Sequence, residues 1–212
     1  MDDCCSGNAK TLETLARGAQ RRVLVIVMIL NAVLFVVELG FGVVARSSAM
    51  MADSVDMLGD AIVYALSLYA LSRGDRWHAG AALAKAGLIL GFGAAILVET
   101  AFKIIGGVTP SSTIMLAVTA IALVGNLTCL GLLWRFRGLN VNMASTFECS
   151  RNDVLANLGV LAAGGLVGWF GNGWPDVLAG LIIAGLFLRS AVRVLGAAWP
   201  VWRRGSHAVA LP

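Results

Sequence analysis

Charged residues are scarce in this sequence: Asp, Glu, Lys and Arg make up 13% of the 212 residues, whereas 58% are hydrophobic. Soluble globular domains carry about 25% charged and about 45–50% apolar residues, so this composition excludes a soluble domain. Cysteine and histidine are also few, at four and two residues. These numbers suit neither a disulfide framework nor an array of zinc fingers. The composition indicates an integral membrane protein.

Six apolar segments are long enough to cross a bilayer, which takes about 20 residues. Because lipid offers the backbone no hydrogen-bonding partner, every span is expected to be a helix. The expected spans are residues 23–45, 50–71, 79–105, 113–134, 144–170 and 177–195. The sequence therefore predicts an all-α integral membrane protein with three parts: a cytoplasmic tail at 1–22, a six-transmembrane-helix bundle at 23–195 and a short cytoplasmic tail at 196–212.

The basic residues indicate how the spans are oriented. Lys and Arg residues gather before the first span, after the last, and in the segments joining spans two to three and four to five, whereas Arg46 and Lys103 lie near the other side. The positive-inside rule then places both termini in the cytoplasm of a multi-pass protein, which we expect in a bacterial inner (plasma) membrane. The net charge of +4 reflects this topology and is no sign of nucleic-acid binding. The long side chains of Lys85, Lys103 and Arg189 are able to extend toward the lipid interface.

Acidic residues are concentrated where they are costly. An ionised side chain near the bilayer centre costs about 2.5–3.5 kcal/mol on an insertion scale, so acids in spans face a protein interior or a water-filled cavity and are candidates for function. Arg151 is expected to pair with one of three of them, Glu148, Glu38 or Glu99. Eight of the twelve acids lie in or at the spans: Glu38, Asp53, Asp56, Asp60, Glu99, Glu148, Asp153 and Asp176.

Two pairs of polar residues have the i, i+4 spacing that places both members on one helix face. Asp56 and Asp60 form one pair, and Cys149 and Asp153 form the other. At 1.5 Å per residue the pairs lie about 9–15 Å and about 15–22 Å from opposite surfaces, so they meet near the middle of a core about 30 Å thick. Three carboxylates and one thiolate predict a four-coordinate site for Zn²⁺ or a similar transition metal rather than Mg²⁺ or Ca²⁺.

Structural alternatives remain at each of these positions. The carboxylates can instead bond to neighbouring backbone or hydroxyl groups, and Cys149 is equally consistent with simple packing. In such a site, crowded carboxylates hold protons in the absence of metal and release them when metal binds. A site that exchanges protons for metal and opens to the two sides in turn describes an antiporter.

Two other functional classes are alternatives to a transporter. An intramembrane hydrolase is disfavoured because Asp56 and Asp60 share one helix and no span contains a histidine that would activate Cys149. A non-transporting metal sensor, or an accessory subunit of a larger metal efflux system, stays open as the alternative to a transporter.

Two stretches resemble the opening of the cation diffusion facilitator (cation efflux) family, whose members are Zn²⁺/H⁺ antiporters with six transmembrane helices. They are Asn31-x6-Glu38-x-Gly40 and Ser48-Ala-Met-Met-Ala-Asp-Ser-Val-Asp-Met-Leu-Gly-Asp60. The resemblance implies a metal site of Asp56 and Asp60 together with Asp153, with Asp53, Glu38 and Asn31 as accessory residues. Trp174-Pro175-Asp176 resembles, in inverted order, the Asp-Pro that begins helix six in the family.

The sequence also departs from the family pattern. Cys149 stands where the family has histidine, which shifts the expected cargo toward thiophilic ions such as Zn²⁺, Cd²⁺ or Co²⁺. The resemblance implies a short form without the family's C-terminal cytoplasmic domain. Whether the chain forms a homodimer therefore stays open. Cys4 and Cys5 are expected either to capture a soft metal or to be free thiols. The expected partners are the lipid bilayer, a divalent metal and protons, with no cofactor and no enzymatic reaction.

Overall fold

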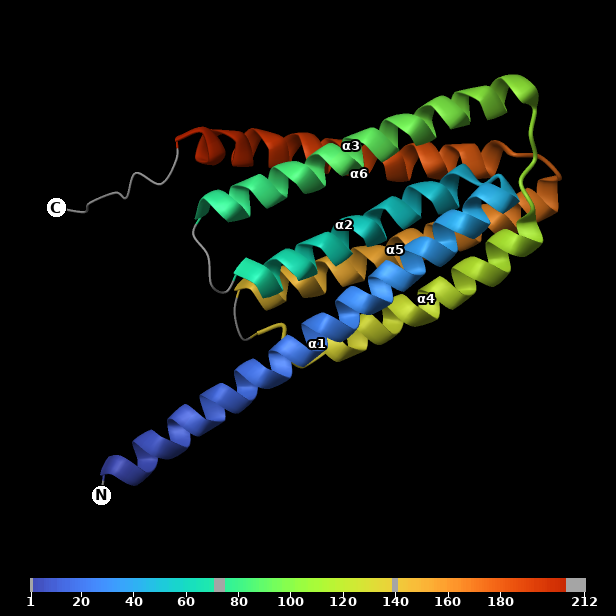
Figure 1. Cartoon of the computed structure of the whole chain (residues 1–212). Coiled ribbons are helices and arrows are strands. Elements are labelled where there is room, and N and C mark those ends of the chain that lie inside the picture. The colour runs from blue at the N-terminus through green and yellow to red at the C-terminus, as the bar shows by residue number, and fades with distance from the viewer. Residues whose placement is uncertain (1, 71–74, 139–140, 205–212) are drawn as a thin grey trace.

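The computed structural model describes residues 2–70, 75–138 and 141–204 and folds them into six helices (Figure 1). Within these ranges there is no strand. This all-α architecture agrees with the expected helical bundle. The helices are α1 (Asp2–Ala45), α2 (Ser48–Ala70), α3 (Asp75–Gly106), α4 (Ser112–Trp134), α5 (Val141–Phe170) and α6 (Trp174–Arg204).

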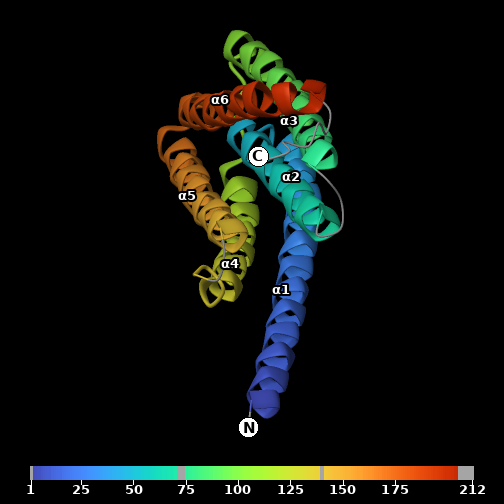
Figure 2. The same ribbon diagram turned by 90° about the vertical axis from the view of Figure 1, so that its left-hand side faces the viewer.

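Each helix contains, or nearly coincides with, one expected span, but two helices are longer than the apolar runs. Residues 2–22, expected as a tail, continue α1, which projects beyond the bundle (Figures 1 and 2). About half of this polar segment consists of Ala, Leu, Glu, Lys, Arg and Gln, and it contains no proline, so the segment is able to continue the helix. At 1.5 Å per residue the 44 residues of α1 span about 66 Å. Residues 196–204 likewise continue α6.

Five segments of the described residues are long and apolar enough to cross a membrane: 18–45, 86–106, 112–134, 146–170 and 174–193. The protein is therefore an integral membrane protein. The helix missing from this set is α2, which carries Asp53, Asp56 and Asp60 within 23 residues. Its polarity is tolerated because α2 packs against α1, α3, α5 and α6, which shield it from lipid.

The remaining packing places two groups of helices around α2. The pair α3 and α6 lies on one side, and α1, α4 and α5 lie on the other (Figure 2). The connections following α1, α3 and α5 lie at one end of the bundle, which we call the turn end (Figure 1). The beginning of α1 and the end of α6 lie at the opposite end (Figure 1). Both ends of the described chain therefore lie at the same end of the bundle.

Glycines terminate two of the helices at the turn end. Gly107 follows α3 with φ +61°, and Gly171 follows α5 with φ +65°. Glycine adopts this left-handed conformation without the steric penalty of a Cβ atom, which is why it commonly ends helices. The two residues allow α3 and α5 to stop just before the connections to the next helix.

Candidate metal transport site

Asp60 of α2 and Asp153 of α5 are buried in the bundle, with 2% and 1% of their surface exposed. The two helices pack against each other, and the charge of Asp153 interacts with those of Asp60 and Asp56. Neither carboxylate oxygen of Asp153 receives a hydrogen bond from a donor in the described residues. The structure thus places a buried carboxylate of α5 beside the acidic face of α2, where it interacts with Asp60 and Asp56.

Tyr64 is a partner of Asp60 that was not anticipated from the sequence. Its Oη donates a hydrogen bond to Asp60 Oδ2 at 2.9 Å, and its side chain is fully buried. The charges of Asp153 and Cys149 also interact with the Tyr64 side chain. The i, i+4 spacing of Asp60 and Tyr64 is the sequence signal that would have suggested this contact.

Asp56 and Cys149 are half-buried, and both interact with neighbouring groups. Cys149 is a free thiol. Among the described residues, no three His, Cys, Asp or Glu side chains are grouped closely enough to hold a metal ion. The four predicted ligands therefore lie on facing helices without converging on one point in this structure.

Asn157 connects α5 to α2 next to these acids. Its Nδ2 donates to Asp53 Oδ2 and to the backbone oxygen of Asp153, both at 2.9 Å. Asn157 was not singled out from the sequence, although it follows Asp153 by four residues and therefore lies on the same helix face. The predicted accessory residue Asp53 is thus tied to the helix that carries Asp153.

The other predicted accessory residues of α1 face α4. Glu38 is fully buried and accepts a hydrogen bond from Thr119 Oγ1 at 3.5 Å. Asn31 Nδ2 donates to the backbone oxygen of Val27 at 3.0 Å and lies 3.9 Å from Cys129 Sγ. Cys4 and Cys5 belong to the first turns of α1, where side chains lie outside the described part of the structure.

Comparison with known protein families identifies the family of this chain. The family described as the cation efflux transmembrane domain matches residues 24–198, which is most of the chain. The chain belongs to the cation efflux (cation diffusion facilitator) family. This confirms the resemblance seen in the sequence, and the family is defined by ion efflux and not by an enzymatic reaction.

Individual relatives of the cation efflux family are distant in sequence. The chain is 27% identical over 191 residues to a cadmium, cobalt and zinc/H⁺-K⁺ antiporter of Bacillus subtilis, covering 84% of this chain and 61% of that protein. It is 26% identical over 197 residues to the metal cation efflux system protein CzcD of Cupriavidus metallidurans, covering 84% of this chain and 62% of that protein. The chain thus spans about three fifths of the length of these relatives.

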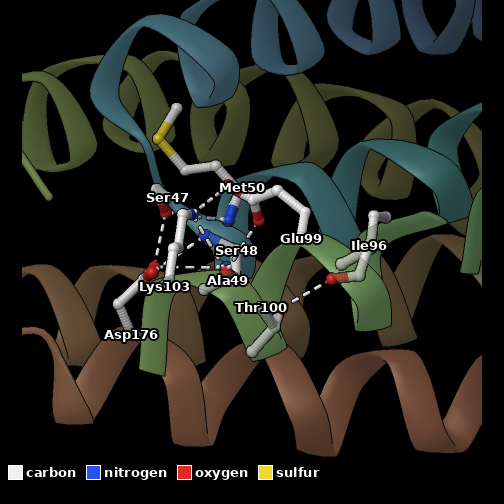
Figure 3. A network of polar contacts seen from close by, with 9 residues as sticks. All are labelled: Ser47, Ser48, Ala49, Met50, Ile96, Glu99, Thr100, Lys103 and Asp176. Atoms are coloured by element: carbon white, nitrogen blue, oxygen red, sulfur yellow. Dashed lines mark hydrogen bonds and ion pairs between the residues drawn. The ribbon is translucent and has the colours of Figure 1, made fainter. Parts of the chain in front are cut away.

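The motif that carries the family resemblance begins at the first turn of α2, where Asp176 of α6 caps the helix (Figure 3). Asp176 accepts hydrogen bonds from Ser47 Oγ at 2.5 Å, from the Ser48 backbone nitrogen at 2.8 Å and from the Ala49 backbone nitrogen at 3.1 Å. Ser47 Oγ in turn accepts from the Met50 backbone nitrogen at 3.1 Å. These bonds satisfy amides that a helix start leaves unpaired. Asp176, expected at the mouth of the sixth span, therefore stabilises α2.

Lys103 joins α3 to the same turn of this cation efflux protein. Its Nζ forms an ion pair with Glu99 Oε1 at 2.9 Å and a hydrogen bond with Ser48 Oγ at 3.0 Å (Figure 3). Only 6% of Lys103 is exposed, so the expectation that it extends toward the lipid interface is wrong. Neighbouring oxygen atoms offset the cost of burying its charge. The expected pairing of Arg151 is confirmed with Glu148, at 2.5 Å.

Proposed function

We propose that this chain exports a divalent transition metal from the cytoplasm in exchange for protons. The observation that carries the proposal is the buried position of Asp153 beside the acidic face of α2, where its charge interacts with those of Asp60 and Asp56. Membership of a cation efflux family and relatives named as metal efflux proteins support the same function. A bacterial plasma membrane with both termini in the cytoplasm is part of the proposal.

The proposed ligands are Asp56, Asp60, Cys149 and Asp153. An arriving cation would remove the repulsion between the carboxylates, and small side-chain rotations would then bring oxygen and sulfur atoms of α2 and α5 together. Mixed oxygen and sulfur ligands suit Zn²⁺, with Cd²⁺ and Co²⁺ as further candidates. Because metal binds deprotonated ligands, loading the site releases protons, and this couples the two ions.

Reconstitution into liposomes tests the proposal directly. Vesicles containing the purified chain, a metal-sensitive dye and a pH-sensitive dye should take up Zn²⁺ as protons leave. Asp60→Asn and Asp153→Asn should reduce metal uptake to the level of empty vesicles. Glu148→Gln is the matched control, because Glu148 is a half-exposed acid of α5 paired with Arg151. Wild-type rates in both Asp variants would refute the assigned site.

A second substitution tests the role of Cys149. Cys149→His restores the ligand that the family pattern has at this position, so relative transport of Zn²⁺ over Cd²⁺ should rise. The measurement is uptake across a panel of Zn²⁺, Cd²⁺, Co²⁺, Ni²⁺ and Mn²⁺. An unchanged profile would mean that Cys149 is not a ligand. Saturable metal binding without any uptake by the wild type would instead favour a sensor or an accessory subunit.

A further inference from the structure

A polar layer on α1 and α4 lies between two groups of buried apolar side chains. Asn31 of α1 and Asn126 and Cys129 of α4 are fully buried, and we call these three residues the amide–thiol group. Helix spacing places Asn126 and Cys129, three residues apart, on one face of α4. The apolar side chains that flank the layer are Leu34, Met57 and Ala122 nearer the turn end, and Leu24, Val27 and Leu133 nearer the opposite end.

The amide–thiol group lies at nearly the same depth as Asp60. The Ser111 backbone nitrogen donates to the Ala45 backbone oxygen at 3.0 Å, so the end of α1 and the start of α4 share one level, from which α2 also begins. Asn31 is 14 residues before the end of α1, Asn126 is 14 residues after the start of α4, and Asp60 is 12 residues after the start of α2. At 1.5 Å per residue all three lie about 18–21 Å from the turn end.

Contacts also connect Cys129 to Asp60, one of the proposed metal ligands. Asn31 Nδ2 lies 3.9 Å from Cys129 Sγ. Cys129 and Tyr64 belong to one packed group of buried side chains, and Tyr64 Oη donates to Asp60 Oδ2 at 2.9 Å. The charge of Asp60 acts on the Cys129 thiol as well. The amide–thiol group therefore borders the proposed metal site from the side of α1 and α4.

The two amides lack the hydrogen bonds that a purely structural role would give them. Asn31 Oδ1 and both side-chain polar atoms of Asn126 have no partner among the described residues. An unpaired buried polar group costs about 1–3 kcal/mol. If Asn126 served only to join α4 to α1, its amide would be paired across that interface. Unpaired amides beside a buried thiol instead indicate a place where a ligand binds.

The donor atoms of the amide–thiol group suit a soft metal ion. A thiolate selects thiophilic ions over Mg²⁺, Ca²⁺ and Mn²⁺, and the neutral amide oxygens of Asn31 and Asn126 add coordination without adding charge. Asp60 supplies a carboxylate at the same depth. Binding through sulfur forms a metal–sulfur bond and displaces the thiol proton, which leaves with the protons of the carboxylates.

We propose that Cys129 is a ligand of the transported metal that sets the preference for thiophilic ions, with the amide oxygens of Asn31 and Asn126 as additional ligands. The inference rests on the proposed function and deepens it, because the site as proposed uses α2 and α5 alone. Helices α1 and α4 then line the site too, and a second sulfur joins that of Cys149. Binding draws Cys129 toward Asp60 by the side-chain rotations proposed for the other ligands.

Ultraviolet absorption by Cd²⁺–thiolate bonds counts the sulfur ligands directly. The test uses the purified full chain carrying Cys4→Ser and Cys5→Ser, which leaves Cys129 and Cys149 as its cysteines. Cd²⁺ should produce a saturable charge-transfer band, because the thiolate is the form of cysteine that binds metal. Adding Cys129→Ser should remove about half of the amplitude where both sulfurs bind, and all of it where Cys149 does not. An amplitude that Cys129→Ser leaves unchanged overturns the inference.

A second variant distinguishes a metal ligand from a packing residue. Asn126→Leu replaces an unpaired amide by an apolar group of similar shape, so the protein should be at least as stable as the wild type. Its apparent Cd²⁺ affinity should nevertheless fall about tenfold, as is usual when a group supporting a metal site is lost. Thr128→Ala is the matched control on the exposed face of α4 and should retain the wild-type affinity. Wild-type Cd²⁺ affinity in Asn126→Leu would refute the role of the amides.

Transport measurements separate failure of this inference from failure of the proposed function. In liposomes, Cys129→Ser should lower the ratio of Cd²⁺ uptake to Zn²⁺ uptake about tenfold, whereas Glu148→Gln should keep the wild-type ratio. An unchanged ratio in Cys129→Ser refutes the inference, while Zn²⁺ and proton exchange that Asp60→Asn abolishes leaves the proposed function standing. Absence of metal uptake by the wild type refutes the proposed function, and the Cd²⁺ band still decides whether Cys129 binds metal.

Discussion

Replacement of Gly180 by alanine tests how closely α6 packs against the first turn of α2. A β-carbon at position 180 would lie 2.9 Å from the backbone carbon of Ser48 and 3.0 Å from the backbone nitrogen of Ala49. These atoms belong to the backbone, so no rotation of a side chain relieves the contact. Alanine at this position must therefore displace α6 from α2 at the point where Asp176 caps α2.

The expected free energy follows from two opposing effects. Overpacking of a fitted interior typically costs about 1–3 kcal/mol, whereas alanine gains up to about 1 kcal/mol over glycine within a helix. Gly180→Ala should therefore lower the free energy of unfolding by about 1–2 kcal/mol. Gly185 supplies the control on the same helix, because a β-carbon there would meet no atom within 4 Å. Gly185→Ala should leave the free energy unchanged or raise it by up to about 1 kcal/mol.

The two variants are compared by reversible unfolding of the purified protein in mixed micelles, followed by tryptophan fluorescence. The informative quantity is the difference in the free energy of unfolding between the two alanine variants, because both add one methyl group to α6. A Gly180→Ala protein as stable as Gly185→Ala would refute the close approach of α6 to the start of α2.

Three further predictions concern the polar contacts of α2, and the same unfolding measurement checks each of them. Asp176→Ala leaves two buried backbone N–H groups of α2 without their acceptor and should cost about 2–4 kcal/mol; a loss below about 0.5 kcal/mol would contradict the cap. Lys103→Met and Glu99→Gln should be non-additive, with a coupling energy of about 0.5–3 kcal/mol in a double-mutant cycle, and simple additivity would show that the ion pair contributes nothing. Tyr64→Phe removes the hydrogen bond to Asp60 and should cost about 0.5–1.5 kcal/mol, and an equally stable variant would contradict that bond.

The sequence was sufficient to predict the helices, because long apolar runs determine them locally. The start of α1 was missed because the prediction relied on those apolar runs. Hydropathy marks where a helix enters lipid, whereas residues 2–22 continue α1 because they favour helix without being apolar. Apolar character alone does not mark α2 as a span because three aspartates interrupt it, although the spacing of Asp56 and Asp60 identified it as the helix of interest.

Contacts between helices are the part that one sequence could not provide. The i, i+4 rule placed Asp56 with Asp60 and Cys149 with Asp153, because helix geometry alone relates residues of one helix. Asn157 and Asp53 are 104 residues apart, and their hydrogen bond depends on how α2 and α5 are rotated toward each other. Lys103 was misjudged for this reason, since its partner Ser48 lies on another helix 55 residues away.

The acids of α2 explain why this helix occupies the centre of the bundle. A helix with Asp53, Asp56 and Asp60 on neighbouring turns is expensive to expose to lipid, and the four helices packed around α2 remove that cost. Asp176 and Lys103 then fix the first turn of α2 to α6 and α3 at the turn end. A buried polar network thus holds the first turn of α2 to α6 and α3, and the hydrogen bond between Asn157 and Asp53 holds its next turns to α5.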